Sequence, residues 1–259
     1  NIGSAATLIG NPQNILVGQA LRLSFGRYLL DAAVPAVAGL AAAWWIVRAR
    51  VAGRWERTTE LRAGAGAPPL HAWRTTKGLL VLGAVTVLFL LAPWPREMVA
   101  LGGAALLLTS RHVRSRRMLG LVDWQMLVLF CALFVVHGAL AASGLERQAL
   151  DALAGQGVDL SRPAWLFGVT VLLSNVVSNV PAVMLLLPAA SHPLAGPVLA
   201  LASTLAGNLV VVGSIANMIV IDQAARMGVH VGWREHARVG VPTTLATLAI
   251  AALWLWLVG

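Results

Sequence analysis

The chain contains 259 residues, of which 58% are hydrophobic and 11% charged, and its formal net charge is +9. A soluble domain carries about 25% charged residues, so this composition excludes an ordinary soluble domain and predicts an integral membrane protein. Fourteen of the 19 Lys and Arg residues fall into three connecting segments, which argues against a basic surface that binds nucleic acid.

The first polar feature in chain order is the segment 10–14, GNPQN, which stands close to apolar stretches. Gly10 permits unusual backbone geometry and Pro12 lacks an amide donor, so we expect a helix to be interrupted here. At such a break, carbonyl groups of one half-helix and amide groups of the next lose their intrahelical partners. The carbonyl ends suit a cation such as Na⁺, and the amide ends suit an anion.

Several apolar stretches are close in length to the about 20 residues that a helix needs to cross the core of a bilayer. We interpret residues 1–48 as the end of a first structural repeat, 49–77 as an arginine-rich linker and 78–259 as a second repeat. A set of long helices in a soluble core is the alternative, but it would leave too little surface for water. The expected spans lie near 28–47, 78–93, 97–109, 120–142 and 237–258, and a broken helix occupies 193–225.

Residues 163–190 are apolar but are interrupted in the middle by Ser174, Asn175, Ser178 and Asn179. A re-entrant hairpin with a polar tip accounts for this pattern, because irregular backbone survives at membrane depth only where protein or water covers it. The alternative is an ordinary kinked span whose Ser and Asn side chains bond to neighbouring helices.

The break at GNPQN has a weak internal copy. With an offset of 203 positions, LIGNPQNILV overlays VVGSIANMIV, so that Gly10 matches Gly213 and Asn14 matches Asn217. In each copy a polar break, a short apolar piece and a turn precede a full span, and counting crossings makes the two copies point in opposite directions. Inverted repeats with interrupted helices at corresponding positions are typical of secondary transporters.

The basic residues indicate an orientation. They concentrate in 48–77, 111–117 and 226–238, three segments that the crossing count places on one face, with 94–97 and 143–162 on the other. The positive-inside rule makes the arginine-rich face cytoplasmic and the C-terminus external. We expect these arginines to orient the chain, and not to take part in chemistry.

Three polar residues inside or beside the spans have two interpretations each. Asp123 either takes part in ion coupling or reaches the membrane interface from the end of its span. His137 either transfers protons or is a packed, hydrogen-bonded residue. Asn208 either lines the site or bridges helices.

The sequence offers no support for an enzyme or a primary pump. It contains no His-Glu-x-x-His, no Gly-x-Ser-x-Gly, no cysteine pair and no Gly-x-x-x-x-Gly-Lys phosphate loop. We therefore expect no catalytic residues and no cofactor other than a coupling ion, Na⁺ or H⁺.

Several motifs in order resemble the ion transporter superfamily, which includes arsenite permeases, divalent-anion/sodium symporters of the dicarboxylate and citrate type, and certain sodium/proton antiporters. These are NIGSAATLIGNPQNILVG, VDWQMLVLFCALFVVHGAL, and SNVVSNVPAVMLLLP followed by LASTLAGNLVVVGSIANMIV. The resemblance covers nearly the whole chain except the linker. The branch most similar by eye is that of anion permeases related to arsenite permease.

This resemblance implies residues for the site. In the dicarboxylate branch a Ser-Asn-Thr triplet at each hairpin tip holds sodium and substrate, and here Ser178 and Asn179 occupy its first two places, with Val180 in the third. In the first break, Asn11 stands where that branch has Thr and Gln13 where it has Pro. These departures argue against a dicarboxylate substrate.

The expected protein is therefore an all-α polytopic carrier with a re-entrant hairpin and discontinuous helices, in a bacterial inner membrane. It would move a small anion, either an inorganic oxyanion such as arsenite or a carboxylate, and by resemblance it would form a homodimer. A sodium/proton antiporter is the alternative within the superfamily, and a channel or a structural membrane protein is the alternative outside it. The chain opens without an initiating Met, so we expect a fragment that lacks an N-terminal part.

The expected binding residues combine the two breaks with the hairpin tip. They are Thr7, Gly10, Asn11, Pro12, Asn14, Ser174, Asn175, Ser178, Asn179, Val180, Pro181, Asn208, Gly213, Ser214 and Asn217, with Na⁺ expected at Ser178, Asn179, Gly213, Gly10 and Asn14.

Overall fold

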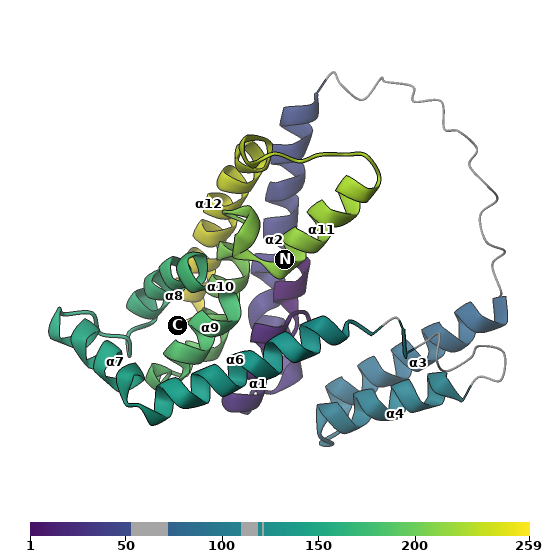
Figure 1. Cartoon of the computed structure of the whole chain (residues 1–259), viewed down its shortest axis with the longest axis horizontal. Coiled ribbons are helices and arrows are strands. Elements are labelled where there is room, and N and C mark those ends of the chain that lie inside the picture. The colour runs from purple at the N-terminus through teal and green to yellow at the C-terminus, as the bar shows by residue number, and fades with distance from the viewer. Residues whose placement is uncertain (53–71, 110–118, 121) are drawn as a thin grey trace. The chain divides into compact units, whose positions relative to one another are not determined.

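The computed structural model describes residues 1–52, 72–109, 119–120 and 122–259, and in this part of the chain every regular element is a helix (Figure 1). Much of the expected linker and the basic segment 111–117 lie outside the described residues. The helices are η1 (Gly3–Ala6), α1 (Pro12–Ala20), α2 (Phe25–Val51), α3 (Ala72–Leu91), α4 (Arg96–Leu108), α6 (Trp124–Ala142), α7 (Leu145–Gly155), α8 (Pro163–Val177), α9 (Asn179–Leu186), η2 (Leu187–Ala189), α10 (Ala195–Ala206), η3 (Val211–Gly213), α11 (Ile215–Arg226) and α12 (Trp233–Val258).

The chain divides into two compact units. The first contains residues 1–55 and 133–259, and the second contains residues 56–132. Both expected helix breaks and the expected hairpin belong to the first unit.

Helix α10 is the centre of the first unit. All of its residues are buried, and it packs against α8, α9, α12 and α1. Its sequence AGPVLALASTLA has small or apolar residues on every side, as expected of a helix that is surrounded by protein. The small side chains allow the neighbouring helices to approach closely.

The two long helices α2 and α12 lie side by side and antiparallel (Figure 1). The indole Nε1 of Trp254 donates to the backbone oxygen of Asp31 at 2.7 Å. Further along, Thr247 packs against Gly39, where an added Cβ would lie 3.1 Å from the Thr247 methyl group. The full spans that follow the two breaks therefore run in opposite directions.

Residues 163–190 leave one end of the unit and return to it. Helix α8 ends at Val177, Ser178 has a φ of 78° and α9 begins at Asn179. Arg162, before α8, and His192, after η2, line the same cavity of about 550 Å³. This is the path of a helical hairpin, and α8, with 15 residues, is shorter than a bilayer-crossing helix.

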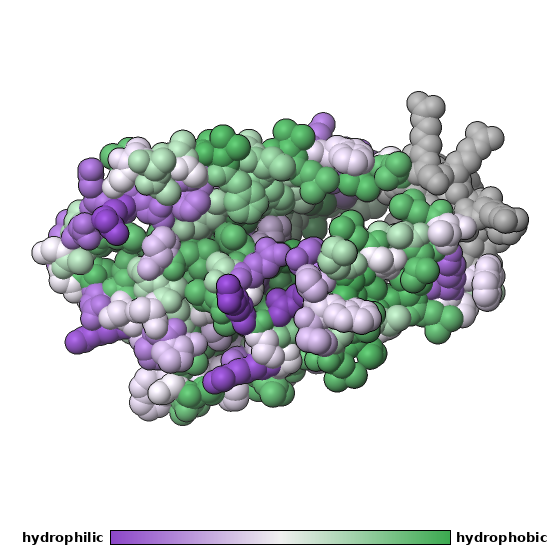
Figure 2. Space-filling view, turned by 90° about the horizontal axis from the view of Figure 1, so that it is seen from below, coloured by the Kyte–Doolittle hydropathy of each residue, from purple (hydrophilic) through white to green (hydrophobic). Residues whose placement is uncertain are grey.

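Three of the described helices are long and apolar enough to cross a membrane: Phe25–Val51, Trp124–Ala142 and Trp233–Val258. Helix α6 has no buried residue in its 19-residue length, and an apolar helix of this length is suited to contact with lipid. Hydrophobic side chains are also widely exposed on the face in Figure 2, between groups of hydrophilic ones. Together these helices describe an integral membrane protein.

Two helices begin earlier than the expected spans, because polar residues before the apolar window are also helical. Helix α3 begins at Ala72 and α12 at Trp233, both earlier than the apolar windows. Helix α7 (Leu145–Gly155) was not expected. It carries Glu146 in its first turn and is amphipathic, as is typical of a helix that lies along a membrane surface.

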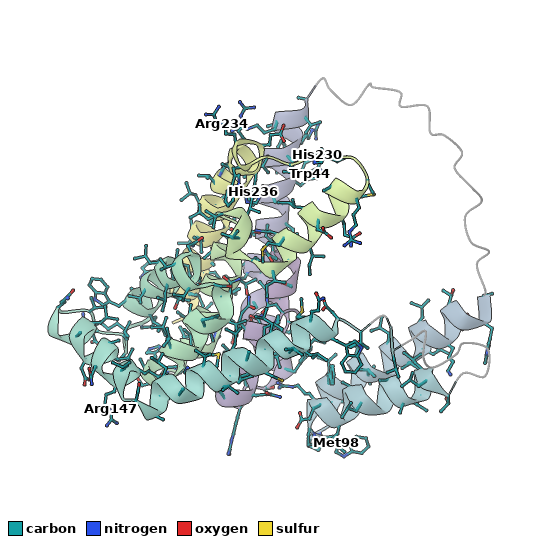
Figure 3. The ribbon with its side chains drawn as sticks, viewed as in Figure 1. Trp44, Met98, Arg147, His230, Arg234 and His236 are labelled. Carbon is teal, nitrogen blue, oxygen red and sulfur yellow. The ribbon has the colours of Figure 1, made fainter. Side chains whose placement is uncertain are left out.

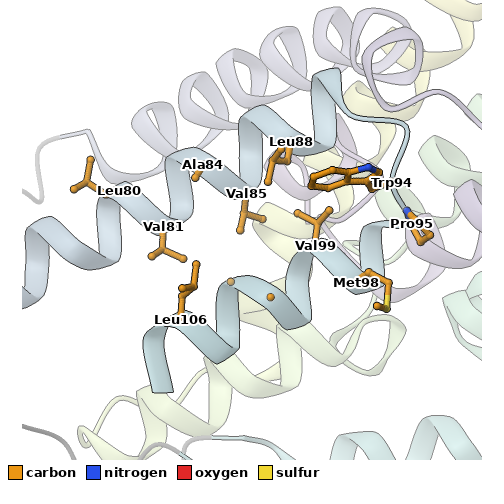
Figure 4. A pocket seen from close by; sticks show the side chains of 12 residues that line it. Leu80, Val81, Ala84, Val85, Leu88, Trp94, Pro95, Met98, Val99 and Leu106 are labelled. Atoms are coloured by element: carbon orange, nitrogen blue, oxygen red, sulfur yellow. The ribbon is translucent and has the colours of Figure 1, made fainter. Parts of the chain in front are cut away.

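The second unit contains a helical pair, α3 and α4, with an apolar groove of about 850 Å³ between them (Figure 4). Gly103 allows the close approach, because an added Cβ would lie 2.7 Å from Val85. The residues that line the groove include Val81, Leu88 and Met98, and none of the twelve is charged. The groove therefore has no ligands for an ion.

Candidate functional site

The first break is held together by the side chain of Asn14. This residue is fully buried, and its amide nitrogen donates to the backbone oxygens of Thr7 at 2.9 Å and Ser4 at 3.4 Å. The side-chain oxygen of Asn11 caps α1 by accepting from the backbone nitrogen of Asn14 at 2.9 Å. Pro12 takes the first helical position, where its missing amide hydrogen costs nothing.

The second break repeats these contacts. The amide nitrogen of Asn217 donates to the backbone oxygens of Gly207 at 2.7 Å and Val210 at 3.3 Å. Ser214 caps α11 by accepting from the backbone nitrogen of Ala216 at 3.3 Å. Each break therefore satisfies backbone groups that a broken helix leaves without intrahelical partners.

Gly10 and Gly213 have corresponding places in the two breaks. A Cβ on Gly10 would overlap the backbone carbonyl group of Ser4. A Cβ on Gly213 would lie 3.3 Å from the backbone oxygen of Gly207 and 3.5 Å from the side-chain oxygen of Asn175. Close approach of backbone to backbone explains why position 10 is glycine, whereas the packing around Gly213 is tight without an overlap of this kind.

The two breaks lie against each other and exchange hydrogen bonds. The amide nitrogen of Asn1 donates to the side-chain oxygen of Asn217 at 3.0 Å, and the hydroxyl of Ser214 donates to the side-chain oxygen of Asn1 at 2.9 Å. In the other direction, the hydroxyl of Thr204 donates to the side-chain oxygen of Asn14 at 3.3 Å.

Thr204 has further partners in the first break. Its hydroxyl oxygen accepts from the amide nitrogens of Asn11 at 3.0 Å and Gln13 at 3.2 Å. Asn1 and Thr204 stand 203 positions apart, the same offset that separates Asn14 from Asn217. The contact between the breaks is thus reciprocal.

The hairpin tip reaches the second break. The side chain of Asn179 lies 2.9 Å from the backbone oxygen of Ser203 and 3.2 Å from that of Gly213, and its amide nitrogen donates to both in the orientation that satisfies its polar atoms. Buried oxygens of Ser174 and Asn175 have no hydrogen-bond partner among the described residues. Because buried polar atoms are rarely left unpaired, these two oxygens are candidate ligands.

The site is built from neutral groups. Amides, hydroxyls and backbone atoms make all of the hydrogen bonds described above, and no Asp, Glu, Lys or Arg takes part in them. Helices α1, α9 and α11 all begin at this cluster, at Pro12, Asn179 and Ile215. Three helix N-termini bring partial positive charge to the cluster without a buried cation.

Several expected residues have a defined place in this arrangement. Val180 is buried in α9, and Pro181 is the third residue of the same helix. The side-chain oxygen of Asn208 accepts from Asn1 at 2.9 Å, and its backbone oxygen lies 3.1 Å from Nε2 of His236, so it joins three segments. His137 lies on α6 and is half-buried.

Asp123 belongs to the second unit. Its carboxylate accepts from the backbone nitrogen of Met126 at 3.0 Å and it is exposed. Such a bond at the start of α6 is the ordinary contact of an acidic residue that caps a helix.

Four partners of the breaks were not among the expected site residues. Asn1, Ser4 and Thr204 are described above, and the hydroxyl of Tyr28 accepts from Asn14 at 3.2 Å and donates to the backbone oxygen of Ala5 at 2.8 Å. The 203-residue offset pairs Thr204 with Asn1, but because neither residue was expected at the site, the offset alone gave no signal for them.

Comparison with known proteins places the chain among transporters. Residues 1–206 match the family described as "Citrate transporter", a match that contains the first break and the hairpin. An uncharacterized transporter of Mycobacterium tuberculosis is 30% identical, over 99% of this chain and 65% of that protein. The inner membrane protein YbiR of Escherichia coli is 30% identical over 91% of this chain and 58% of that protein. The putative transporter arsB of Dictyostelium discoideum is 30% identical over 61% of this chain and 29% of that protein.

Proposed function

The chain belongs to the citrate transporter family, and on this basis we propose that it carries one part of the binding site of a secondary active transporter for a small anion. The family and the relatives are described as transporters, and we therefore propose transport and not catalysis as the activity. The chain spans 65% of the length of the mycobacterial relative, so the activity proposed is that of the whole protein, and every experiment below uses the full-length protein.

The reciprocal hydrogen bonding of the two breaks is the observation that supports the proposal. Asn1 and Thr204 each reach across to the break of the other segment, and the spans that follow the breaks are antiparallel. An inverted repeat whose interrupted helices meet at the middle of the membrane would have this arrangement. Neither a channel nor a structural membrane protein would require it.

The charge distribution favours an anion as substrate. A cluster of neutral amides at three helix N-termini attracts negative charge, because the positive ends of three helix dipoles point at it. A formal positive charge is not needed, so an anion can bind without the very tight binding and slow release that a buried Arg or Lys would cause. The substrate proposed is an inorganic oxyanion such as arsenite, or a carboxylate.

The unpaired oxygens favour a cation beside the anion. The side-chain oxygens of Ser174 and Asn175 are buried and without partners among the described residues, and the backbone oxygen of Gly213 is close to the same hairpin. Hard cations bind oxygen ligands, and amide and backbone carbonyl oxygens are among them. We assign these oxygens, with Ser178, to Na⁺. In the first break, Gly10 and Asn14 are the corresponding candidates, and H⁺ is the alternative coupling ion.

The transport motion proposed is a movement of the hairpin and the broken helices as one body against the other spans. The hydrogen bonds that join the two breaks, together with the contacts of Asn179, tie these pieces to the buried helix α10. A homodimer in a bacterial inner membrane, with the arginine-rich segments in the cytoplasm, completes the proposal. The hydrogen bonds between the two breaks do not depend on the dimer, on the type of membrane or on the orientation.

A thermal-shift screen of the full-length protein tests the function. Arsenite, sulfate, phosphate and citrate are each added with and without Na⁺, because a ligand that prefers the native state raises its apparent stability. We expect one of these anions to raise the melting temperature, and to do so more strongly in Na⁺. The absence of any rise for this panel would contradict an anion carrier of the proposed classes.

Uptake into proteoliposomes separates the remaining alternatives. A carrier gives saturable uptake that Asn179→Ala abolishes, whereas a channel gives flux that rises linearly with concentration and shows no competition. Proton movement driven by Na⁺ in the absence of any anion would instead support the sodium/proton antiporter.

A further inference from the structure

The cavity at the base of the hairpin combines basic and apolar residues. Its volume is about 550 Å³, within the about 300–1,000 Å³ that is typical of sites enclosing a small ligand. Of the eleven described residues that line it, two are basic and none is acidic. The basic residues are Arg162 and His192, and the others are Pro163, Ala164, Phe167, Leu194, Val198, Ala252, Leu255, Trp256 and Gly259.

One wall of the cavity is a single face of α12. Four lining residues come from this helix and its C-cap at the spacing i, i+3, i+4 and i+7, namely Ala252, Leu255, Trp256 and Gly259. Residues at this spacing lie on the same face of a helix. The end of this face touches the start of α10, because a Cβ on Gly259 would overlap the side chain of Leu194. The cavity therefore lies between packed helices.

The two basic residues lie at the same end of the cavity. Helices α8 and α10 pack against each other and run in the same direction, since the hairpin tip after α8 is close to the last turn of α10. Arg162 directly precedes α8, and His192 comes three positions before the first residue of α10. Phe167 and Val198 lie about one turn inside these helices. The cavity thus has a basic mouth and an apolar interior.

Both basic side chains can donate to a ligand at the mouth. The backbone nitrogen of Leu194 donates to Nδ1 of His192 at 3.1 Å, so the hydrogen of the neutral imidazole is on Nε2. Nε of Arg162 contacts the carboxylate of Asp159 at 3.2 Å, and these side chains are 75% and 49% exposed. Such an exposed ion pair is weak, and it leaves the two Nη groups of Arg162 for a second anion.

Two exposed tryptophans place the mouth at the level of lipid headgroups. Trp256 lines the cavity and is 77% exposed, and Trp165, near the start of α8, is 46% exposed. Tryptophan accumulates at the interface between membrane and water. A basic mouth at this level, with an apolar interior behind it, matches a ligand that has an anionic head and a hydrocarbon chain.

We propose that this cavity binds an anionic phospholipid. The phosphate lies at the mouth, where Arg162 and His192 donate to its oxygens in charge-assisted hydrogen bonds. The upper part of one acyl chain lies along Phe167, Val198 and Ala252. A neutral lipid would leave the arginine without its anion, and a soluble anion would leave the apolar interior unfilled. The site is distinct from the proposed transport site, which lies at the other end of α8.

A lipid titration tests this site without reference to transport. Dioleoylphosphatidylglycerol is added to the full-length protein in detergent, and the melting temperature is followed against lipid concentration. Dioleoylphosphatidylcholine is the neutral comparison. We expect a saturable rise with the anionic lipid that the neutral lipid does not give. Arg162→Gln should weaken the apparent affinity about five-fold, and His192→Gln should weaken it in the same direction.

Arg234→Gln and His230→Gln are the matched controls. Both residues are exposed, and Figure 3 shows them where α12 begins, whereas the cavity is lined by the end of this helix. Their titrations should equal that of the wild type. Equal weakening by Arg162→Gln and Arg234→Gln, or equal stabilisation by the neutral lipid, would overturn the proposal. A rise with inorganic phosphate that Arg162→Gln removes would also overturn it, because the ligand would then be a soluble anion.

Two further variants test the acyl chain and the ion pair. Ala252→Phe fills the apolar interior without a change of charge and should abolish the saturable rise, whereas Leu253→Phe, at an exposed position outside the cavity, should keep it. Asp159→Asn frees Arg162 and should strengthen the apparent affinity about two-fold; it replaces Arg162→Gln if that variant fails to fold. Full binding by Ala252→Phe, or an affinity of Asp159→Asn that is unchanged or weaker, would contradict the proposed site.

Discussion

The side-chain amide nitrogens of Asn14 and Asn217 each donate to the backbone oxygens that lie ten and seven positions earlier in the chain. Each asparagine thus closes the loop in front of its own helix. The same geometry at two breaks, together with the bonds that cross between them, indicates a single cluster with two equivalent halves.

Replacing either asparagine should destabilise the protein by a similar amount. Asn14→Ala leaves the backbone oxygens of Ser4 and Thr7 with one donor fewer, and Asn217→Ala does the same at the second break. We expect each change to lower the free energy of unfolding by about 1–3 kcal/mol. Gln19→Ala and Gln223→Ala, at exposed positions of the same two helices, are the controls and should have little effect. Unfolding of the full-length protein in detergent measures all four.

Thr204 should matter through its hydroxyl and not through its shape. Thr204→Val keeps the volume but removes the acceptor for Asn11 and Gln13 and the donor to Asn14, so we expect a loss of about 1–3 kcal/mol in unfolding free energy. Thr204→Ser should retain most of the stability. Thr247→Val is the control, because the hydroxyl of Thr247 bonds within its own helix. Equal effects of the two valine substitutions would contradict a special role for Thr204.

Gly10 should tolerate no side chain. A Cβ at this position would overlap the backbone carbonyl group of Ser4, so the backbone must move in Gly10→Ala. We expect the free energy of unfolding to fall by about 1–3 kcal/mol or more, the usual cost of overpacking a core. Gly213→Ala should cost less, because its nearest contacts are 3.1 Å or longer. Gly26→Ala is the control, since this helical glycine has open space around it and alanine favours the helix. Melting temperatures should rank Gly26→Ala highest and Gly10→Ala lowest.

Tyr28 should stabilise the first break through its hydroxyl group. Its hydroxyl is buried and joins Asn14 to the backbone oxygen of Ala5. Tyr28→Phe keeps the ring and removes both bonds, and we expect a loss of about 1–2 kcal/mol in unfolding free energy. The change should be much smaller when Asn14 is already alanine, because the two residues share one network. Strict additivity in this double-mutant cycle would show that the bond between them contributes nothing.

The helix breaks and the hairpin were predictable from the sequence because they depend on local chemistry. Gly10, Pro12 and Asn14 within five residues favour a helix boundary, and the polar residues before Pro181 do the same in an apolar stretch. The membership of the transporter superfamily followed from the same motifs, and the family match confirms it.

The contacts between the breaks were not predictable in this way. Thr204 stands in a run of small and apolar residues, LASTLAG, and resembles any threonine of a buried helix. Its role depends on the packing of α1 against α10, which brings together residues that are 190 or more positions apart. Helix α7 was missed for a different reason, because its alternation of polar and apolar residues keeps its mean hydropathy low.

The most direct test of the proposed site is the ligand-dependent rise in melting temperature of full-length Asn175→Leu. The side-chain oxygen of Asn175 is buried and unpaired among the described residues, so without ligand this variant should have a stability close to that of the wild type. The variant also loses the bond from the Asn175 amide nitrogen to the backbone oxygen of Val171 at 2.9 Å, so its ligand-free stability is measured first and serves as the reference. If the side-chain oxygen binds the coupling ion, the rise given by Na⁺ together with the anion found in the screen should be lost. A variant that keeps the full ligand-dependent rise would show that the hairpin tip and the second break do not form the binding site.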